Sequence, residues 1–168
     1  MKKLWNVMIS IMLMMILVLS GCSSQTKPKD NTASSIVNVS DKILDEMEGP
    51  PKNGHTLERH VGKTDEQLKE RLRTDNVSAA STYYDKETAT KAVKDGLKQH
   101  EKEIEKWLKE SKENRLVLNT KHNFAVGKAV LKKDMRVKDG LRNTVTVLQR
   151  DKGSQLGFKI ITSYPSEK

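Results

Sequence analysis

The chain has 168 residues and a formal net charge of +9 at pH 7. Its single cysteine, Cys22, excludes an internal disulfide, so the folded part must be held together by its core. The excess of basic residues favours an anionic partner, such as nucleic acid, anionic lipid or an acidic cell-wall polymer, and charge does not distinguish among these.

Residues 1–21 have the parts of a secretory signal peptide. The start is positively charged, and residues 4–19 are almost continuously apolar. Leu19-Ser20-Gly21-Cys22 then matches the lipobox of bacterial lipoproteins, in which small residues precede the cysteine that receives a lipid. An uncleaved transmembrane anchor is the alternative, but residues 4–19 fall short of the ~20 residues that a bilayer span needs. We therefore expect an extracytoplasmic protein, anchored to the bacterial cell membrane by a lipid on Cys22.

Residues 22–52 are predicted to join the lipid to a folded domain. Residues 23–35 contain no large apolar residue, which is typical of a flexible tether. The apolar residues of 36–49 have the spacing of a short amphipathic helix, and Gly49-Pro50-Pro51 ends it. This helix either packs on the domain or belongs to the tether.

Residues 53–168 are predicted to form one domain that begins with two helices. The first starts near Thr56 and stops at Gly62. The second begins at Thr64, because Gln67 three residues later completes a capping box.

A short strand and a long helical region follow. The strand is expected over residues 78–84, and Asp85 is expected to cap a helical region that continues to about residue 111. Residues 96–100 are a candidate break that would divide this region into two helices.

After residue 114 the apolar pattern changes from the helical period to alternation. Four strands are expected over residues 115–120, 124–131, 144–150 and 155–164. Turns are expected at Asp139-Gly140 and at residues 151–153. Helices first and strands afterwards indicate an α+β domain with a mostly antiparallel sheet.

Motifs for metal or nucleotide chemistry are absent. The histidines at positions 55, 60, 100 and 122 do not have the spacing of a zinc site, and no HExxH motif occurs. The sequence also lacks a nucleophilic serine elbow, a P-loop and a GxGxxG fingerprint. Neither a metal nor a cofactor is therefore expected.

Three blocks of sequence carry a resemblance to a known family. They are residues 54–64 (GHTLERHVGKT) with Leu68 and Arg71 after them, residues 78–82 (SAAST) and residues 158–165 (FKIITSYP). In this order and spacing they resemble the bacterial RNase A-like toxin domain, found at the C-termini of contact-dependent growth inhibition effectors and other secreted polymorphic toxins. The resemblance covers about residues 53–165 and implies a fold similar to pancreatic-type ribonuclease without its disulfides.

The resemblance implies a catalytic set of His60, Arg71, Thr162 and Tyr164. Metal-free RNA cleavage needs a base for the 2′-hydroxyl, a cation for the phosphoryl oxygens and an acid for the departing 5′-oxygen. His60 suits either proton transfer, and the planar fork of Arg71 matches phosphate oxygens. Thr162 is expected to donate a hydrogen bond, and Tyr164 to act as an acid or as a donor to an oxyanion. The expected first product is a 2′,3′-cyclic phosphate.

Alternation along the last predicted strand places Thr162 and Tyr164 on one face of the sheet. It puts Thr162 and Tyr164 on the same face as Leu156, Phe158 and Ile160, the last three of which are expected to face the core. Thr162 and Tyr164 would then project from that face at the end of the strand, beside a cleft.

Further residues are candidates for substrate binding. No histidine lies in the last strand, so His55 and His122 are alternative second proton carriers. Basic residues expected to contact RNA phosphates are Lys63, Lys128, Lys132, Lys133 and Arg136. Aromatic residues that would either stack on bases or pack in the core are Tyr83, Tyr84 and Phe124.

Two functions from different classes remain at this point. The first is a monomeric, metal-independent ribonuclease toxin on a lipid anchor, with RNA as substrate and a cognate immunity protein as partner. The second is a non-catalytic lipoprotein that binds an anionic polymer or a partner protein through a degenerate ribonuclease fold. The presence of all four implied catalytic residues favours the first. A metal-dependent nuclease is disfavoured by the lack of ligand motifs.

Overall fold

The computed structural model describes residues 39–168. The predicted signal peptide, the lipidation site at Cys22 and the tether at residues 23–35 lie outside the described residues. Within residues 39–168, none of the helices has the length and apolarity required to cross a bilayer.

Helices occupy most of the first half of the described chain. In chain order the elements are α3 (Ile43–Met47), α4 (Thr56–His60), α5 (Asp65–Thr74), β1 (Ala79–Tyr83), α6 (Lys86–Gln99) and α7 (Glu101–Glu110). The predicted capping box opens α5, since Thr64 and Gln67 each accept a hydrogen bond from the other's backbone N–H. The predicted break in the long helical region is confirmed, because α6 ends and α7 begins on either side of His100.

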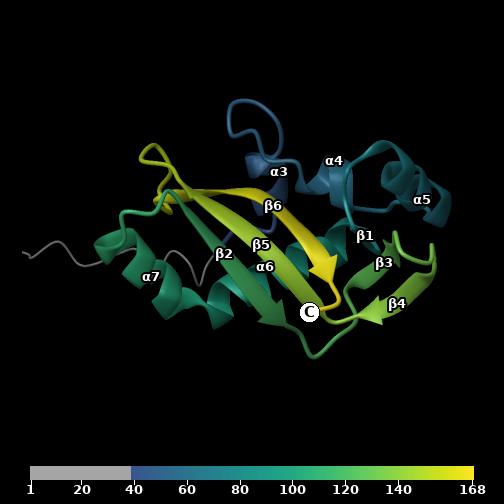
Figure 1. Cartoon of the computed structure of the whole chain (residues 1–168). Coiled ribbons are helices and arrows are strands. Elements are labelled where there is room, and N and C mark those ends of the chain that lie inside the picture. Colours follow the sequence, from purple (N-terminus) through teal and green to yellow (C-terminus); the bar gives the residue numbers. More distant parts are fainter. Residues whose placement is uncertain (1–38) are drawn as a thin grey trace, which may run out of the picture.

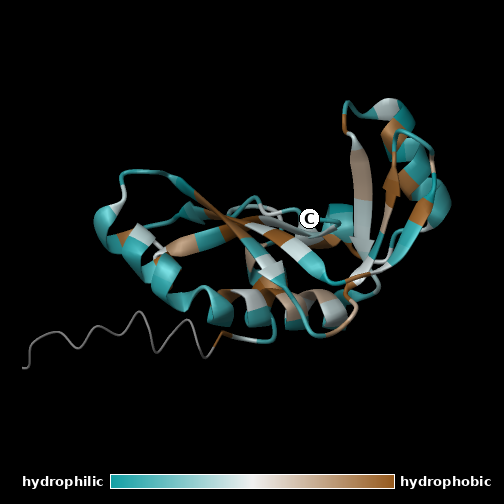
Figure 2. Ribbon diagram, turned by 60° about the horizontal axis from the view of Figure 1, so that its bottom comes forward, coloured by the Kyte–Doolittle hydropathy of each residue, from teal (hydrophilic) through white to brown (hydrophobic). Residues whose placement is uncertain are grey.

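Strands make up the second half. They are β2 (Arg115–Lys121), β3 (Gly127–Leu131), β4 (Val137–Leu141), β5 (Asn143–Arg150) and β6 (Phe158–Ser166). Two three-stranded antiparallel sheets result, with strand orders β1-β3-β4 and β2-β5-β6. The α+β class with antiparallel pairing is therefore confirmed. In Figure 1 and Figure 2 the β1-β3-β4 sheet, with α5, forms an arm at an angle to the β2-β5-β6 sheet.

One predicted turn is wrong. Asp139-Gly140 lies within β4, where Gly140 has a positive φ of 70°. The sequence of β4 lacks an alternating apolar pattern because four of its five residues are exposed. The turn predicted at residues 151–153 is confirmed between β5 and β6.

Two apolar clusters form the core. The larger lies where α3, α6 and α7 pack on the β2-β5-β6 sheet and includes Ile104, Leu118 and Phe158. The smaller lies between α5 and the β1-β3-β4 sheet, where Leu68 and Leu72 are each only 1% exposed. Burial of each leucine side chain contributes about 1.5–3 kcal/mol, which fixes α5 on its sheet.

The segment before the predicted domain is part of the packed structure. Ile43 and Leu44 of α3 are 2% and 1% exposed and belong to the larger core cluster. Lys86 of α6 pairs with Asp45 of α3 at 2.6 Å. Of the two alternatives for this helix, the structure has the one in which it packs on the domain.

A β-bulge in β6 decides which way its side chains point. Ile160 pairs with Leu148 and Thr162 pairs with Val147, so Ile161 is an extra residue in the ladder. Adjacent residues of β5 point to opposite faces, and paired residues of neighbouring strands share a face. Thr162 therefore lies on the face opposite Ile160. The prediction that the two share a face is wrong, because an inserted residue shifts the alternation by one.

Candidate active site

One cleft brings together residues from the two sheets and from helices α4 and α5. Its volume is about 990 Å³. The four residues implied by the family resemblance all line it, together with His55, and they are His60, Arg71, Thr162 and Tyr164. The chain thus assembles its candidate catalytic groups from α4, α5 and β6 at one place.

The short helix α4 carries His60 and is held at its first turn by a carboxylate. Leu57 and Glu58 donate their backbone N–H groups to the side chain of Glu48, at 3.0 and 2.8 Å. A helix of five residues leaves most of its N–H groups without internal partners, so this contact stabilises it. Glu48 precedes the region of the sequence resemblance and was not predicted as a site residue.

Further hydrogen bonds fix α4 along the edge of β6. The backbone N–H of His55 donates to the Ile161 carbonyl at 3.0 Å, and the backbone N–H of Ser163 donates to Thr56 Oγ1 at 2.9 Å. The bulge at Ile161 therefore has two effects. It turns Thr162 into the cleft, and it presents backbone groups to the helix that carries His60.

The position and tautomer of His60 follow from one hydrogen bond. His60 is 7% exposed, and its Nδ1 lies 3.1 Å from the Ser81 carbonyl oxygen in β1. A carbonyl oxygen only accepts hydrogen bonds, so Nδ1 must carry the proton. In the neutral ring, Nε2 then has a lone pair. The ring also stacks with that of Tyr164, with centroids 5.1 Å apart and planes 29° apart.

Burial sets the charge of His60. The pKa of His60 is lowered from 6.5 to about 4. Desolvation is the largest cause, the Ser81 carbonyl opposes it, and the positive charge of Arg71 adds to the lowering. The imidazole is therefore neutral at pH 7. A neutral ring with a free Nε2 is in the form that accepts a proton.

Arg71 is oriented toward the cleft by its own helix and by α4. Its Nε donates to Asp75 Oδ2 at 3.2 Å, and one terminal N–H donates to the Arg59 carbonyl at 3.4 Å. These contacts occupy two N–H groups, and the remaining ones are available to a phosphate.

The hydroxyl of Thr162 is buried and lacks a hydrogen-bond partner among the described residues. The residue is 9% exposed. A buried hydroxyl without a partner costs about 1–3 kcal/mol, so a substrate oxygen that reached it would relieve this cost.

Behind the cleft, a buried polar network holds β6. Ser163 is fully buried, and its hydroxyl lies 2.6 Å from Tyr83 Oη and 2.8 Å from Thr146 Oγ1. Because Ser163 lies between Thr162 and Tyr164, this network fixes both neighbours. Ser81 and Ser163 both lie in blocks that carry the family resemblance, but neither was predicted as a site residue.

The other histidine predicted to carry protons lies away from the cleft. The His122 side chain is fully buried, and its ring nitrogens contact Asp95 Oδ2 at 2.6 Å and Thr144 Oγ1 at 2.9 Å. Both nitrogens are thus engaged in the structure of the domain. His55 lines the cleft, and partial burial, followed by the charge of Arg59, lowers its pKa.

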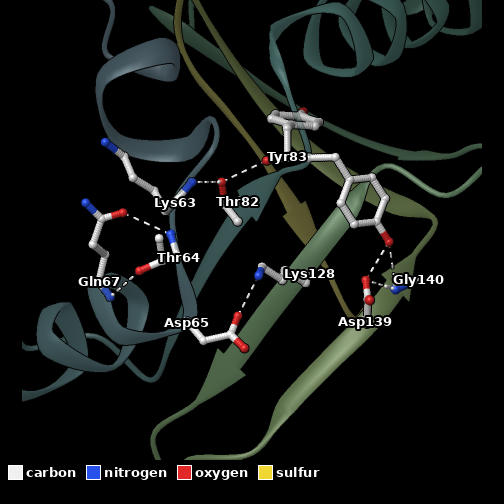
Figure 3. Close-up of polar contacts among 10 residues, drawn as sticks. Lys63, Thr64, Asp65, Gln67, Thr82, Tyr83, Lys128, Asp139 and Gly140 are labelled. Atoms are coloured by element: carbon white, nitrogen blue, oxygen red, sulfur yellow. Dashed lines mark hydrogen bonds and ion pairs between the residues drawn. The ribbon is translucent and has the colours of Figure 1, made fainter.

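The predicted phosphate-binding residues separate into two groups. Lys132 and Lys133 line the cleft. Lys63 and Lys128 do not, and Figure 3 shows a backbone hydrogen bond of Lys63 and the side-chain ion pair of Lys128. Lys128 pairs with Asp65 at 2.6 Å, and the Lys63 backbone N–H donates to the Thr82 hydroxyl at 3.0 Å.

For the three aromatic residues, stacking on bases and packing in the core were the two alternatives. Tyr83 is 0% exposed and has the second of these. Tyr84 is exposed, and its hydroxyl donates to Asp139 at 2.5 Å (Figure 3). Phe124 packs against the His122 ring and beneath Lys91.

No group of three or more His, Cys, Asp or Glu residues within residues 39–168 is arranged to hold a metal ion. The four residues implied by the resemblance bring an imidazole, a guanidinium, a phenol and an unpaired hydroxyl to the cleft, which Lys132, Lys133 and Glu167 also line.

Comparisons with known proteins identify the family and the fold. A family model described as the bacterial CdiA-CT RNAse A domain matches residues 54–165. The chain is also similar to a chain in the crystal structure of the CdiA-CT/CdiI complex from Y. kristensenii 33638, at 32% sequence identity and a TM-score of 0.64. That match covers 67% of this chain and 99% of the other. A search of curated proteins found no match.

Proposed function

The chain belongs to the family of bacterial CdiA-CT RNase A domains, which implies a ribonuclease toxin, and on this basis we propose that it cleaves RNA without a metal ion. The first product would be a 2′,3′-cyclic phosphate. The observation that carries the proposal is the convergence of His60, Arg71, Thr162 and Tyr164 on one cleft, with His60 Nε2 free to accept a proton.

In the proposed reaction, His60 Nε2 removes the proton of the ribose 2′-hydroxyl. The 2′-oxygen then forms a bond to phosphorus while the bond from phosphorus to the 5′-oxygen breaks. Arg71 holds the phosphoryl oxygens, and Thr162 donates its hydroxyl hydrogen to one of them. A phosphate bound at Arg71 also counters the positive charge that lowers the pKa of His60, so substrate binding makes His60 a stronger base.

The departing 5′-oxygen needs a proton, and we assign its donor as Tyr164. Its phenol lies beside the His60 ring in the same cleft. His55 is the alternative donor. An aryl ester of a nucleoside 3′-phosphate separates the two, because its leaving group departs without a proton. The variant that lacks the true donor should lose cleavage of RNA and retain cleavage of the aryl ester. Tyr164→Phe and His55→Ala are the variants to compare.

The test of the proposed function is cleavage of RNA by the purified protein in excess chelator. We expect cleavage with a cyclic phosphate end, and loss of cleavage in His60→Ala. His100→Ala is the matched control, because His100 pairs with Glu103 at 2.7 Å between α6 and α7, away from the cleft. Equal cleavage by wild type and His60→Ala, or none by either, would contradict the proposal and favour the non-catalytic binding function. Loss of cleavage on chelation would favour a metal-dependent nuclease.

We also propose that the domain is displayed outside the producing cell on a lipid attached to Cys22. Export would keep the nuclease away from the producer's own RNA, and the segment after Cys22 would give it reach toward other cells. Labelled palmitate should be incorporated into the protein and lost in Cys22→Ser. Incorporation that persists in the variant, or a full-length uncleaved protein in the membrane, would contradict this anchor.

A cognate immunity protein is the partner that this function requires wherever active nuclease meets the producer's RNA. The similar chain from Y. kristensenii was crystallised as a CdiA-CT/CdiI complex, which supports the proposal. Expression of the domain in a cytoplasm without such a partner should stop growth, and the His60→Ala variant should not. Growth arrest by both would show that toxicity does not come from the proposed cleavage.

A further inference from the structure

The β2-β5-β6 sheet has one uncovered face next to the cleft. Helices α6 and α7 and the larger core cluster cover its other face. In Figure 1 the three strands lie in front of α6, and no helix lies over the face that they turn toward the viewer. We call this the open face.

The strand register determines which side chains the open face carries. Thr162 and Tyr164 lie on it because of the bulge, and cross-strand pairing extends from them to β5 and β2. From one end of the sheet to the other, four rows result: Arg115–Gln149–Lys159, Val117–Val147–Thr162, Asn119–Val145–Tyr164 and Lys121–Asn143–Ser166.

The chemistry of these rows suits single-stranded RNA. The two inner rows begin at the candidate catalytic residues. One continues to Val147 and Val117 and the other to Val145 and Asn119, and Val117 is 50% exposed. The outer rows carry three cations, Arg115, Lys121 and Lys159. None of the side chains in the four rows is acidic, although the chain has 22 Asp and Glu residues. An apolar strip bordered by cations fits the bases and phosphates of an unpaired strand.

The width of the open face also suits a nucleotide. Neighbouring strands lie roughly 4.8 Å apart, so the distance from Thr162 across β5 to Val117 is roughly 10 Å. A nucleotide next to the phosphate held at Thr162 and Arg71 can therefore lie over Val147 and Val117. Exposed Asn119, in the adjacent row, has both a donor and an acceptor for the edge of a base.

We propose that the open face binds the single-stranded RNA segment adjoining the cleaved bond. A base lies on Val117 and Val147, the surrounding cations contact phosphates, and Asn119 contributes base preference. This inference rests on the proposed function, because it takes RNA as the substrate of the neighbouring cleft.

The experiment measures RNA binding separately from cleavage. The probe is a fluorescent single-stranded oligonucleotide of about ten nucleotides with 2′-O-methyl groups, which cannot be cleaved because the attacking hydroxyl is blocked. We expect Val117→Asp to raise the Kd at least about tenfold, because it removes the apolar surface and repels phosphates. Val117→Ser, which adds no charge, should raise it less. The matched control is Val137→Asp in β4, since Val137 is an exposed valine of the other sheet (38%).

Cleavage provides the second measurement. On a cleavable oligonucleotide of that length, Val117→Asp should lower kcat/KM by a similar factor, while Val137→Asp should leave it within about twofold of wild type. Equal RNA binding by wild type and Val117→Asp, or equal losses in Val117→Asp and Val137→Asp, would overturn the inference. Loss of binding to a partner protein without loss of RNA binding would also overturn it and assign the face to that protein. If RNA binds as expected and is never cleaved, the inference stands and the proposed function fails.

Discussion

The buried imidazole of His60 should make the protein less stable as the pH falls below neutral. Burial lowers the pKa of His60 from 6.5 to about 4, so the unfolded chain takes up a proton there over a pH range in which the folded chain does not. The contribution of His60 to the free energy of unfolding is greatest above about pH 6.5. It decreases as the pH falls from 6.5 toward 4, and it changes no further below about pH 4. The full difference amounts to about 3 kcal/mol, at about 1.36 kcal/mol per pKa unit.

The measurement is the free energy of unfolding in urea as a function of pH. Wild type should lose roughly 2–3 kcal/mol more than His60→Asn between about pH 7 and about pH 4.5. Asn is the chosen replacement because its amide can still donate to the Ser81 carbonyl, while it has no group that titrates in this range. Other histidines and carboxylates titrate equally in both proteins, so the difference between the two curves isolates His60.

The reasoning fails if the two stability curves run parallel, or if NMR titration gives His60 a pKa of 6.5 or higher. Catalysis supplies a linked observation. Protonation of His60 removes the proposed base, so the acid limb of kcat/KM for RNA should lie well below pH 6.5.

Three further substitutions test how the site is supported. Glu48→Ala should lower the free energy of unfolding by about 1 kcal/mol and also reduce kcat, because it removes the carboxylate that holds the first turn of α4; an unchanged kcat would show that α4 is positioned without it. Gly127→Ala should destabilise by about 3 kcal/mol or more in thermal or urea unfolding, since a Cβ at this position would collide with the Thr82 carbonyl. Tyr83→Phe should cost about 1–2 kcal/mol through loss of the buried hydrogen bond to Ser163, and a neutral result would show that this bond adds nothing to stability.

The elements that sequence patterns predicted well are those with a strong local cause. The capping box at Thr64, the cap at Asp85 and the break near His100 all involve groups close together in the chain. The α+β order also follows from local periodicity. By contrast, β4 was missed, because an edge strand of mostly exposed residues has no apolar alternation to detect.

The candidate site was predicted in part. The sequence resemblance implied a catalytic set of His60, Arg71, Thr162 and Tyr164, and all four line one cleft in the structure. Lys63 and Lys128 had no basis beyond their charge, and both lie outside that cleft.

The sequence by itself therefore determined the class of the fold and the family to which its motifs belong, because helix caps, apolar periods and short motifs depend on neighbouring residues. Only the tertiary structure decided how those motifs work together. The bulge at Ile161 turns Thr162 and Tyr164 away from the core, the Ser81 carbonyl selects the tautomer of His60, and Glu48 secures α4. Each of these depends on a contact between segments distant in the chain, and a linear pattern does not record such a contact.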